Sequence, residues 1–111
     1  MNELDFDGKT VLVDFSAAWC VTCLVNERVA LENPDVVAGY QKHGVVLLKA
    51  DWTNRDSAIS AELDRYGRSG VPLYLLYPAH RQGRATVLPQ ILTPGIVLSA
   101  LDDARVADKN R

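Results

Sequence analysis

The stretch "VLVDFSAAWCVTC", residues 11–23, gives the clearest indication of the fold in this chain of 111 residues. Its beginning lies in the longer run Lys9–Phe15, "KTVLVDF", whose β-branched and apolar residues predict a buried strand. Cys20 and Cys23 follow at once, where a helix is expected to begin, and the chain has no other cysteine. The pair could bind a metal, cross-link the fold or carry out redox chemistry, and the surrounding residues decide among these.

Further apolar runs predict three more strands. Val45–Trp52 is expected to be a second buried strand, Leu73–Tyr77 a third, and Ala85–Leu88 a fourth, shorter one. Helical patterns separate the first two strands, so these should be parallel and joined by a right-handed crossover. The third and fourth are separated only by a turn at 78–83, which predicts an antiparallel hairpin. The expected fold class is therefore α/β, a mixed four-stranded sheet flanked by helices on both faces.

Capping residues mark where several helices begin. Asn33-Pro34 and Thr93-Pro94 each combine an N-cap with a proline at the first helical position. The segment 53–56, "TNRD", resembles a capping box with aspartate in place of the usual glutamate. The final residues, "RVADKNR" (105–111), are polar and are expected to be frayed.

Composition favours one ordinary globular domain. The hydrophobic share is 48%, and 12 basic residues against 14 acidic ones give a formal net charge of −2. No charge bias points to nucleic acid or an anionic membrane, and no apolar run approaches the roughly 20 residues that span a bilayer. The first seven residues, "MNELDFD", lack the apolar segment of a signal peptide. We expect a single domain over residues 1–111, with its core at about 9–105, that is monomeric in isolation and binds no nucleic acid.

The cysteine spacing favours redox chemistry over a metal site or a cross-link. At a helix start, unpaired N–H groups and the helix dipole favour a Cys20 thiolate, and Cys23 lies one turn further on the same side. A disulfide across so small a loop contributes little entropic stability and is easily broken and remade. Structural zinc usually takes four ligands, and His43 and His80 do not have a matching spacing. We expect no metal and no cofactor other than the redox-active pair, although an inert buried pair and transient copper(I) binding stay open.

Two acidic residues near the pair call for an explanation. Asp14 lies within an apolar strand, where a charge is costly unless its side chain points outward into solvent. Glu27 lies seven residues after Cys20, so two helical turns place both near one face, unless Glu27 is an ordinary solvated residue.

These residues together resemble the thioredoxin superfamily. The opening stretch resembles its active-site segment, with Asp14 at the place of the family's buried acid, and "SGVP" (69–72) resembles its second signature, a loop ending in a cis-proline at Pro72. Within the superfamily the resemblance is greatest to the C-terminal periplasmic domain of the bacterial disulfide reductase DsbD family, and it covers about residues 9–102. It rests on "WCVTC", on Glu27 as a second acid, and on "NPDVV" (33–37), "ADWTNRD" (50–56), "RYGRSGVPLYLLY" (65–77) and "LPQILTPGIVLSALD" (88–102).

The sequence also departs from thioredoxin in three places. Val21-Thr22 replaces the Gly-Pro between the cysteines, Leu24 replaces the following lysine, and only a short segment precedes the first strand. These departures argue against a general cytoplasmic thioredoxin.

The resemblance implies a protein-disulfide reductase that forms one part of a larger membrane protein. In the DsbD family a membrane-embedded domain takes electrons from cytoplasmic thioredoxin and passes them to the C-terminal domain. That domain hands them to an N-terminal periplasmic domain, which reduces isomerases and cytochrome c maturation factors. We therefore expect protein thiols and disulfides as partners, with both of those domains among them, and a periplasmic location tethered to the inner membrane.

Roles for individual residues follow from this resemblance. We expect Cys20 to be the nucleophile, Cys23 the resolving thiol, and Asp14 and Glu27 to raise the pKa of Cys20. Asp14 is also expected to accept the proton of Cys23. The expected substrate-binding residues are Trp19, which shields the site, Pro72, which shapes the groove, and Val71, whose backbone pairs with the partner chain. A stand-alone oxidant or isomerase and a copper(I)- or client-binding module are the alternatives.

Overall fold

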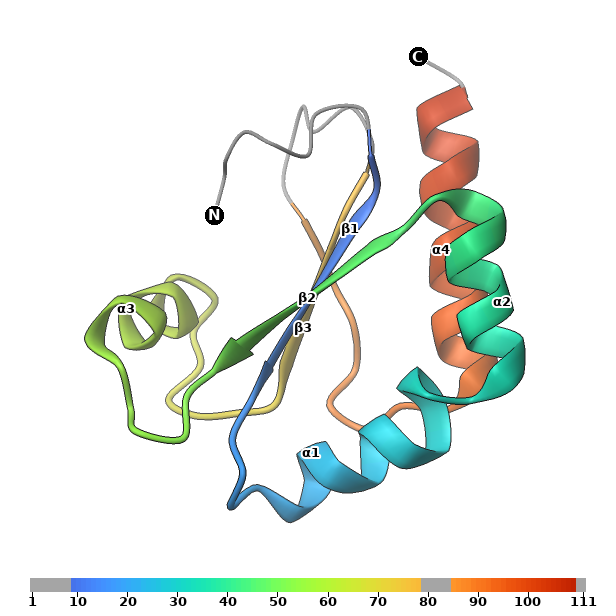
Figure 1. The fold of residues 1–111 in the computed structure, drawn as a ribbon. Coiled ribbons are helices and arrows are strands. Elements are labelled where there is room, and N and C mark those ends of the chain that lie inside the picture. Colours follow the sequence, from blue (N-terminus) through green and yellow to red (C-terminus); the bar gives the residue numbers. More distant parts are fainter. Residues whose placement is uncertain (1–8, 79–84, 110–111) are drawn as a thin grey trace.

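The computed structural model describes residues 9–78 and 85–109. Its four strands are β1 (Val11–Ser16), β2 (Val46–Asp51), β3 (Leu73–Tyr77) and β4 (Thr86–Val87). They form one sheet in the order β2-β1-β3-β4, in which β1 is parallel to β2 and β3 is antiparallel to both of its neighbours. The predicted mixed sheet is confirmed (Figure 1). The predicted turn at 78–83 lies almost wholly outside the described residues.

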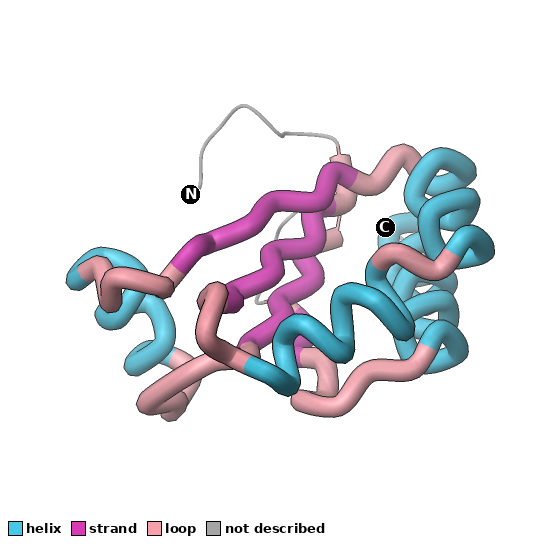
Figure 2. Tube along the Cα trace, turned by 60° about the horizontal axis from the view of Figure 1, so that its bottom comes forward, coloured by secondary structure: helices cyan, strands magenta, loops and turns pink. Residues whose placement is uncertain are grey.

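Helices cover both faces of this sheet, as predicted. They are α1 (Val21–Asn26), which continues as a π-helical turn η1 (Glu27–Leu31), α2 (Pro34–His43), α3 (Ser57–Arg65) and α4 (Pro94–Lys109). Figure 1 shows α3 on one side of the sheet and α2 beside α4 on the other. In Figure 2, where the lower end of that view comes forward, α1 lies across this end of the sheet.

Strand β1 is the centre of the fold because every one of its residues is buried. Val13 and Phe15 lie in the apolar cluster that also contains Leu63 of α3, whereas Leu12 lies in the cluster that includes α2 and α4. Because side chains alternate along a strand, Asp14 shares the face of Leu12 and is directed toward the helices that continue from the cysteine pair.

The prediction of a fully buried second strand is wrong. Strand β2 lies at the edge of the sheet, and its residues alternate between half-buried and exposed. Val46, Leu48 and Ala50 pack in the cluster of the α3 side. The other three, Leu47, Lys49 and Asp51, project from the opposite face and are exposed.

Two local predictions also need correction. Thr53 does not cap α3: the N-cap is Asp56, whose carboxylate accepts the N–H groups of Ala58 and Ile59. Thr53 is instead held by Asp51, which accepts its backbone N–H and its hydroxyl. The polar segment expected to be frayed from residue 105 continues α4 as helix to Lys109. By contrast, Asn33 is the N-cap of α2, and the Thr93 hydroxyl accepts the N–H of Ile96, as predicted.

Candidate active site

The cysteine pair lies at the junction of β1 and α1. Cys20 is the N-cap of α1, with extended backbone (φ −91°, ψ 105°), and its Sγ accepts the N–H of Cys23 at 3.2 Å. The two form a disulfide with a Cα–Cα distance of 5.3 Å. Cys23 is completely buried, whereas Cys20 keeps 8% of its surface exposed. A partner arriving from solvent therefore meets the sulfur of Cys20 first.

The loop after β2 holds Trp19 beside the pair. The indole N–H of Trp19 donates to the Thr53 carbonyl at 3.0 Å, and the N–H of Ala18 donates to the Thr53 hydroxyl at 2.9 Å. The rings of Trp19 and Trp52 lie 5.9 Å apart, and the Arg55 guanidinium lies 4.8 Å from the centroid of each. Trp19 is thus fixed from one side while 48% of its surface stays exposed, so it can both border the site and touch a partner.

The segment before β3 forms another wall of the site. The Val71–Pro72 peptide bond is cis, as the resemblance predicted. Val71 packs against the small buried cluster of Ala17, Cys20 and Cys23. Pro72 is buried, and its carbonyl accepts a hydrogen bond from Arg68 at 3.1 Å. Residues some fifty positions after the cysteines therefore meet them in space, as the two motifs require.

Asp14 points into the protein, so the alternative of an outward side chain is wrong. It has no exposed surface, and neither carboxylate oxygen has a hydrogen-bond partner among the described residues. The pKa of Asp14 is raised from 3.8 to about 6, mainly by burial and also by the negative charge of Glu27, while the positive charge of Lys49 opposes the rise. A carboxyl with such a pKa can take up and release a proton near neutral pH.

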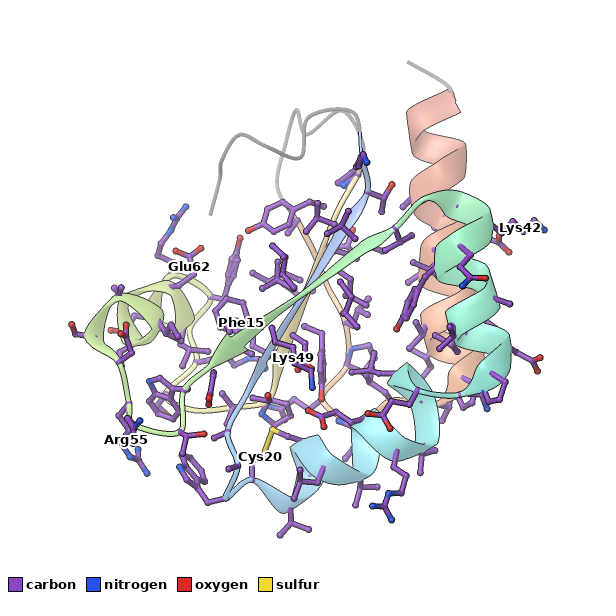
Figure 3. All side chains as sticks on the ribbon, viewed as in Figure 1. Phe15, Cys20, Lys42, Lys49, Arg55 and Glu62 are labelled. Carbon is purple, nitrogen blue, oxygen red and sulfur yellow. A yellow bond between two sulfur atoms is a disulfide. The ribbon has the colours of Figure 1, made fainter. Side chains whose placement is uncertain are left out.

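Glu27 is not an ordinary solvated residue either. Its side chain is only 15% exposed, and its Oε2 lies 3.5 Å from the Lys49 ammonium. Lys49 is the register partner of Asp14 across the parallel β1–β2 pair, so both project from the same face of the sheet. Figure 3 shows Lys49 extending from β2 toward the end of the sheet where Cys20 lies. The structure therefore brings together Asp14, Glu27 and Lys49.

Asn26 is a second polar residue inside the protein. It is 2% exposed; its Nδ2 donates to the Tyr74 hydroxyl at 2.9 Å and to the Gln90 carbonyl at 2.7 Å. Its Oδ1 accepts the N–H of Leu92 at 3.1 Å. These bonds tie the active-site helix to β3 and to the segment before α4, so Asn26 fixes the position of α1.

Sequence reasoning missed Lys49, Asn26 and Arg55. Lys49 was detectable by the same signal as Asp14, since it is a charged residue within an apolar strand. Asn26 follows Cys23 by three positions and so lies on its helical face, which is the buried one. No local pattern marks Arg55, because its contacts come from two tryptophans brought together by the fold.

Among residues 9–78 and 85–109, no group of three or more His, Cys, Asp or Glu side chains is placed to hold a metal ion. The Nε2 of His43 lies 3.5 Å from the Oδ1 of Asp102 in α4, whereas His80 is outside the described residues.

Among the helices described, none is both long enough and apolar enough to cross a membrane.

Several curated proteins similar to this chain are named thiol:disulfide interchange protein DsbD. DsbD 2 of Pseudomonas aeruginosa is 39% identical over 80 residues, which is 71% of this chain and 13% of that protein. DsbD 1 of the same organism is 40% identical over 70 residues, 63% of this chain and 12% of that protein. DsbD of Salmonella typhi is 32% identical over 104 residues, 92% of this chain and 17% of that protein. The chain thus spans less than a fifth of the length of each.

Solved structures and a family model agree with this. The reduced C-terminal domain of Neisseria meningitidis DsbD has a TM-score of 0.72 at 22% identity, covering 91% of this chain and 84% of that one. A thioredoxin from Thermus thermophilus has a TM-score of 0.72 at 18% identity, covering 91% and 77%. These two show the thioredoxin-like fold, and the curated relatives together with the family model confirm the resemblance found in the sequence. The family model described as Thioredoxin-like matches residues 1–79, so the chain belongs to the thioredoxin-like family.

Proposed function

We propose that this chain is a thiol–disulfide oxidoreductase domain that passes electrons to a protein partner through Cys20 and Cys23. The observation that carries the proposal is the disulfide between a helix N-cap cysteine that keeps 8% of its surface exposed and a completely buried cysteine one turn later. Its small loop makes the bond easy to break and remake. The similarity to proteins named thiol:disulfide interchange protein supports the same chemistry.

The exchange would run in two steps in the reducing direction. The Cys20 thiolate attacks the partner's disulfide, forms a mixed disulfide and expels one partner thiolate. The Cys23 thiolate then attacks the Cys20 sulfur, which restores the Cys20–Cys23 bond and releases the second partner thiolate. Two electrons pass from the dithiol to the partner. Burial suits Cys23 to the second step, since only Cys20 is within its reach.

Asp14 and Glu27 would control when Cys20 reacts. Negative charge and burial both disfavour a thiolate, so the two acids oppose the helix start and raise the pKa of Cys20. Lys49 moderates this effect because its ammonium lies against Glu27. Asp14, with its pKa raised to about 6, would accept the proton of Cys23 as that thiol attacks. Cys20 is then held mostly protonated and resists stray oxidation until a partner binds.

Trp19, Val71 and Pro72 would bind the partner beside Cys20. Support comes from their positions: Trp19 borders the pair with about half of its surface exposed, and Val71 packs against the buried cluster that contains both cysteines. The backbone of Val71 would pair with an extended segment of the partner, in the manner of an added strand.

The wider role would be a relay within a larger protein. The chain would accept electrons from a membrane-embedded domain and deliver them to an N-terminal periplasmic domain, while tethered to the inner membrane. This arrangement is supported by the similarity to DsbD proteins. The chain matches less than a fifth of the length of each of them, so they contain further parts. No cofactor beyond the disulfide is required by this scheme.

The decisive experiment is a titration of the reduced domain. Thiolate absorbance should give a lower pKa for Cys20 in Asp14→Asn and Glu27→Gln, and the lowest in the double variant. Asp35→Asn, an exposed acid on α2, is the matched control. An unchanged Cys20 pKa in the double variant would show that the electrostatic account is wrong.

A trapping experiment tests the exchange itself. Cys23→Ser should accumulate mixed disulfides with protein partners through Cys20, whereas Cys20→Ser, whose remaining thiol is buried, should not. Failure of Cys23→Ser to trap any disulfide protein, together with tight copper(I) binding by the wild type, would instead favour a metal-binding module. A strongly oxidising reduction potential would favour an oxidant.

A further inference from the structure

A row of aliphatic side chains on the outer face of the active-site helix lies open to solvent. It consists of Val21, Leu24, Val25 and Val29, which are 48 to 73% exposed, and is called here the α1 stripe. Of the nine exposed large apolar residues in the described part of the chain, five fall within residues 19–29, the stripe and Trp19. Single exposed apolar residues are normal on a protein surface, but such a cluster marks an interaction site.

The stripe does not contribute to the packing of the helix against the protein. The buried side of α1 is supplied by Cys23 and Asn26, and the helix carries no charged residue from Val21 to Asn26. A groove of about 380 Å³ runs along the outer side, lined by three stripe residues and three charged ones: Val21, Leu24, Val25, Glu27, Arg28 and Glu32. The apolar part of the groove begins at the residue directly after Cys20, and the charged residues follow from Glu27 onward.

The stripe is within reach of any protein that exchanges a disulfide at Cys20. At 1.5 Å per residue, Val29 lies only about 14 Å along the helix from Cys20. A redox encounter that buries up to about 600 Å² on each partner covers a patch with a radius of up to about 14 Å. Figure 2 shows that α1 lies across one end of the sheet. The loop that precedes α1 and the loop that precedes β3 lie at the same end. One partner can therefore cover Cys20 and the stripe together.

We propose that the α1 stripe binds the exchange partner, and that this partner presents apolar side chains next to its reactive cysteine. The inference rests on the proposed function and names the class of its substrate. Apolar neighbours of the partner cysteine would lie on Leu24 and Val25, where burial of both surfaces is favourable. Charged neighbours would lose water there without gaining a partner, so the stripe selects against them.

The dimensions of the stripe disfavour a second copy of the chain as its occupant. Four partly exposed aliphatic side chains present well under the roughly 800 Å² of accessible surface that each partner buries in a stable interface. The stripe is therefore suited to a transient encounter centred on Cys20, in which it adds selectivity among partner proteins.

The test uses two synthetic peptides of eleven residues, each with a central cysteine in a mixed disulfide with glutathione. One peptide has leucines beside the cysteine and the other glutamines, and their net charges are equal. Five residues on each side reach about 17 Å, enough to contact the stripe. The reduced domain converts each peptide to its thiol and releases glutathione while the Cys20–Cys23 disulfide forms. Each rate is divided by the rate with oxidised glutathione, so that changes in Cys20 reactivity cancel.

We expect the wild type to reduce the leucine peptide about tenfold faster than the glutamine peptide, which corresponds to about 1.4 kcal/mol. In Leu24→Gln/Val25→Gln this ratio should fall to about two or less. The matched control, Val37→Gln, replaces an apolar residue on α2 that is 38% exposed and should keep the wild-type ratio. Thermal unfolding checks that the variants fold. If a variant does not fold, the ratio of the two peptide rates in the wild type still tests the inference.

A wild-type ratio near one, or a ratio that survives in the double variant, overturns the inference. A dimer in sedimentation that only the double variant loses would overturn it in favour of a second copy. Stripe-dependent binding to phosphatidylglycerol vesicles, without peptide selectivity, would overturn it in favour of a lipid surface. If the wild type reduces neither peptide nor oxidised glutathione, the proposed function itself fails, which is distinct from reducing both peptides equally.

Discussion

Replacing Asp14 with asparagine should remove a pH-dependent loss of stability from the oxidised domain. The Asp14 side chain is completely buried without a hydrogen-bond partner among the described residues, so its ionised form is disfavoured in the folded state. The carboxyl keeps its proton to about pH 6 when folded but loses it near pH 3.8 when unfolded. Between these values the folded state binds more protons, so its stability falls as pH rises.

The size of this loss follows from the two pKa values of Asp14. They differ by about two pH units, and each unit corresponds to about 1.36 kcal/mol. The stabilising contribution is therefore fully present below pH 3.8, decreases as pH rises through 6, and is gone above about pH 7, a total of about 3 kcal/mol. Asparagine does not titrate, and any cost of burying its amide is the same at every pH.

Urea unfolding of the oxidised wild type and Asp14→Asn between pH 4 and pH 8 measures the effect. The free energy of unfolding of the variant, minus that of the wild type, should rise by about 2.5 kcal/mol across this range, because a small part of the total is already lost at pH 4. Asp51→Asn is the matched control, because hydrogen bonds from Thr53 lower the pKa of Asp51. Its difference from the wild type should stay nearly flat from pH 4 to pH 8, since a carboxyl with a lowered pKa changes stability only at lower pH. A difference for Asp14→Asn that stays flat, or that grows toward low pH, would refute the reasoning.

Three other substitutions test the surroundings of the site. Lys49→Met removes the charge that lowers the pKa of Asp14, so the pH at which stability falls should move upward in the same urea series; a downward move would contradict this. Asn26→Ala leaves buried groups unpaired and should cost about 2–4 kcal/mol by urea unfolding. A loss under about 1 kcal/mol would mean that water replaces the amide. Arg55 has a φ of 54°, so Arg55→Gly should be about 1 kcal/mol more stable than Arg55→Ala in thermal unfolding. Equal stabilities would exclude backbone strain there.

Much of the fold could be predicted because its signals are local. The run around Val11–Ser16 is buried on both faces and is therefore mostly apolar, which identifies a central strand without any partner being known. The caps at Asn33 and Thr93 form hydrogen bonds within two to four residues of themselves, so their positions follow from short segments. Thr53 shows the limit of this reasoning, since its hydroxyl is used by Asp51 and by Ala18 of another loop.

Some residues of the candidate site could likewise be predicted from the sequence, and others could not. The cysteine spacing and the acid within an apolar strand are visible in "VLVDFSAAWCVTC", because a buried charge conflicts with its neighbours in the chain itself. Lys49 acquires its place beside Asp14 only through the parallel register of β1 and β2. Its contact with Glu27 likewise joins residues from separate elements.

The sequence by itself determined the order of strands and helices, the cysteine pair and the buried Asp14. Hydrophobic periodicity, helix capping and the cost of a charge in an apolar strand all act within a few residues. Only the tertiary structure decided which faces are covered. It left β2 at an edge, buried Asn26, and exposed the aliphatic face of α1 beside Cys20. Whether an apolar side chain is core or surface depends on segments that arrive from far along the chain, and a helical pattern such as Val21, Leu24 and Val25 is the same in either case.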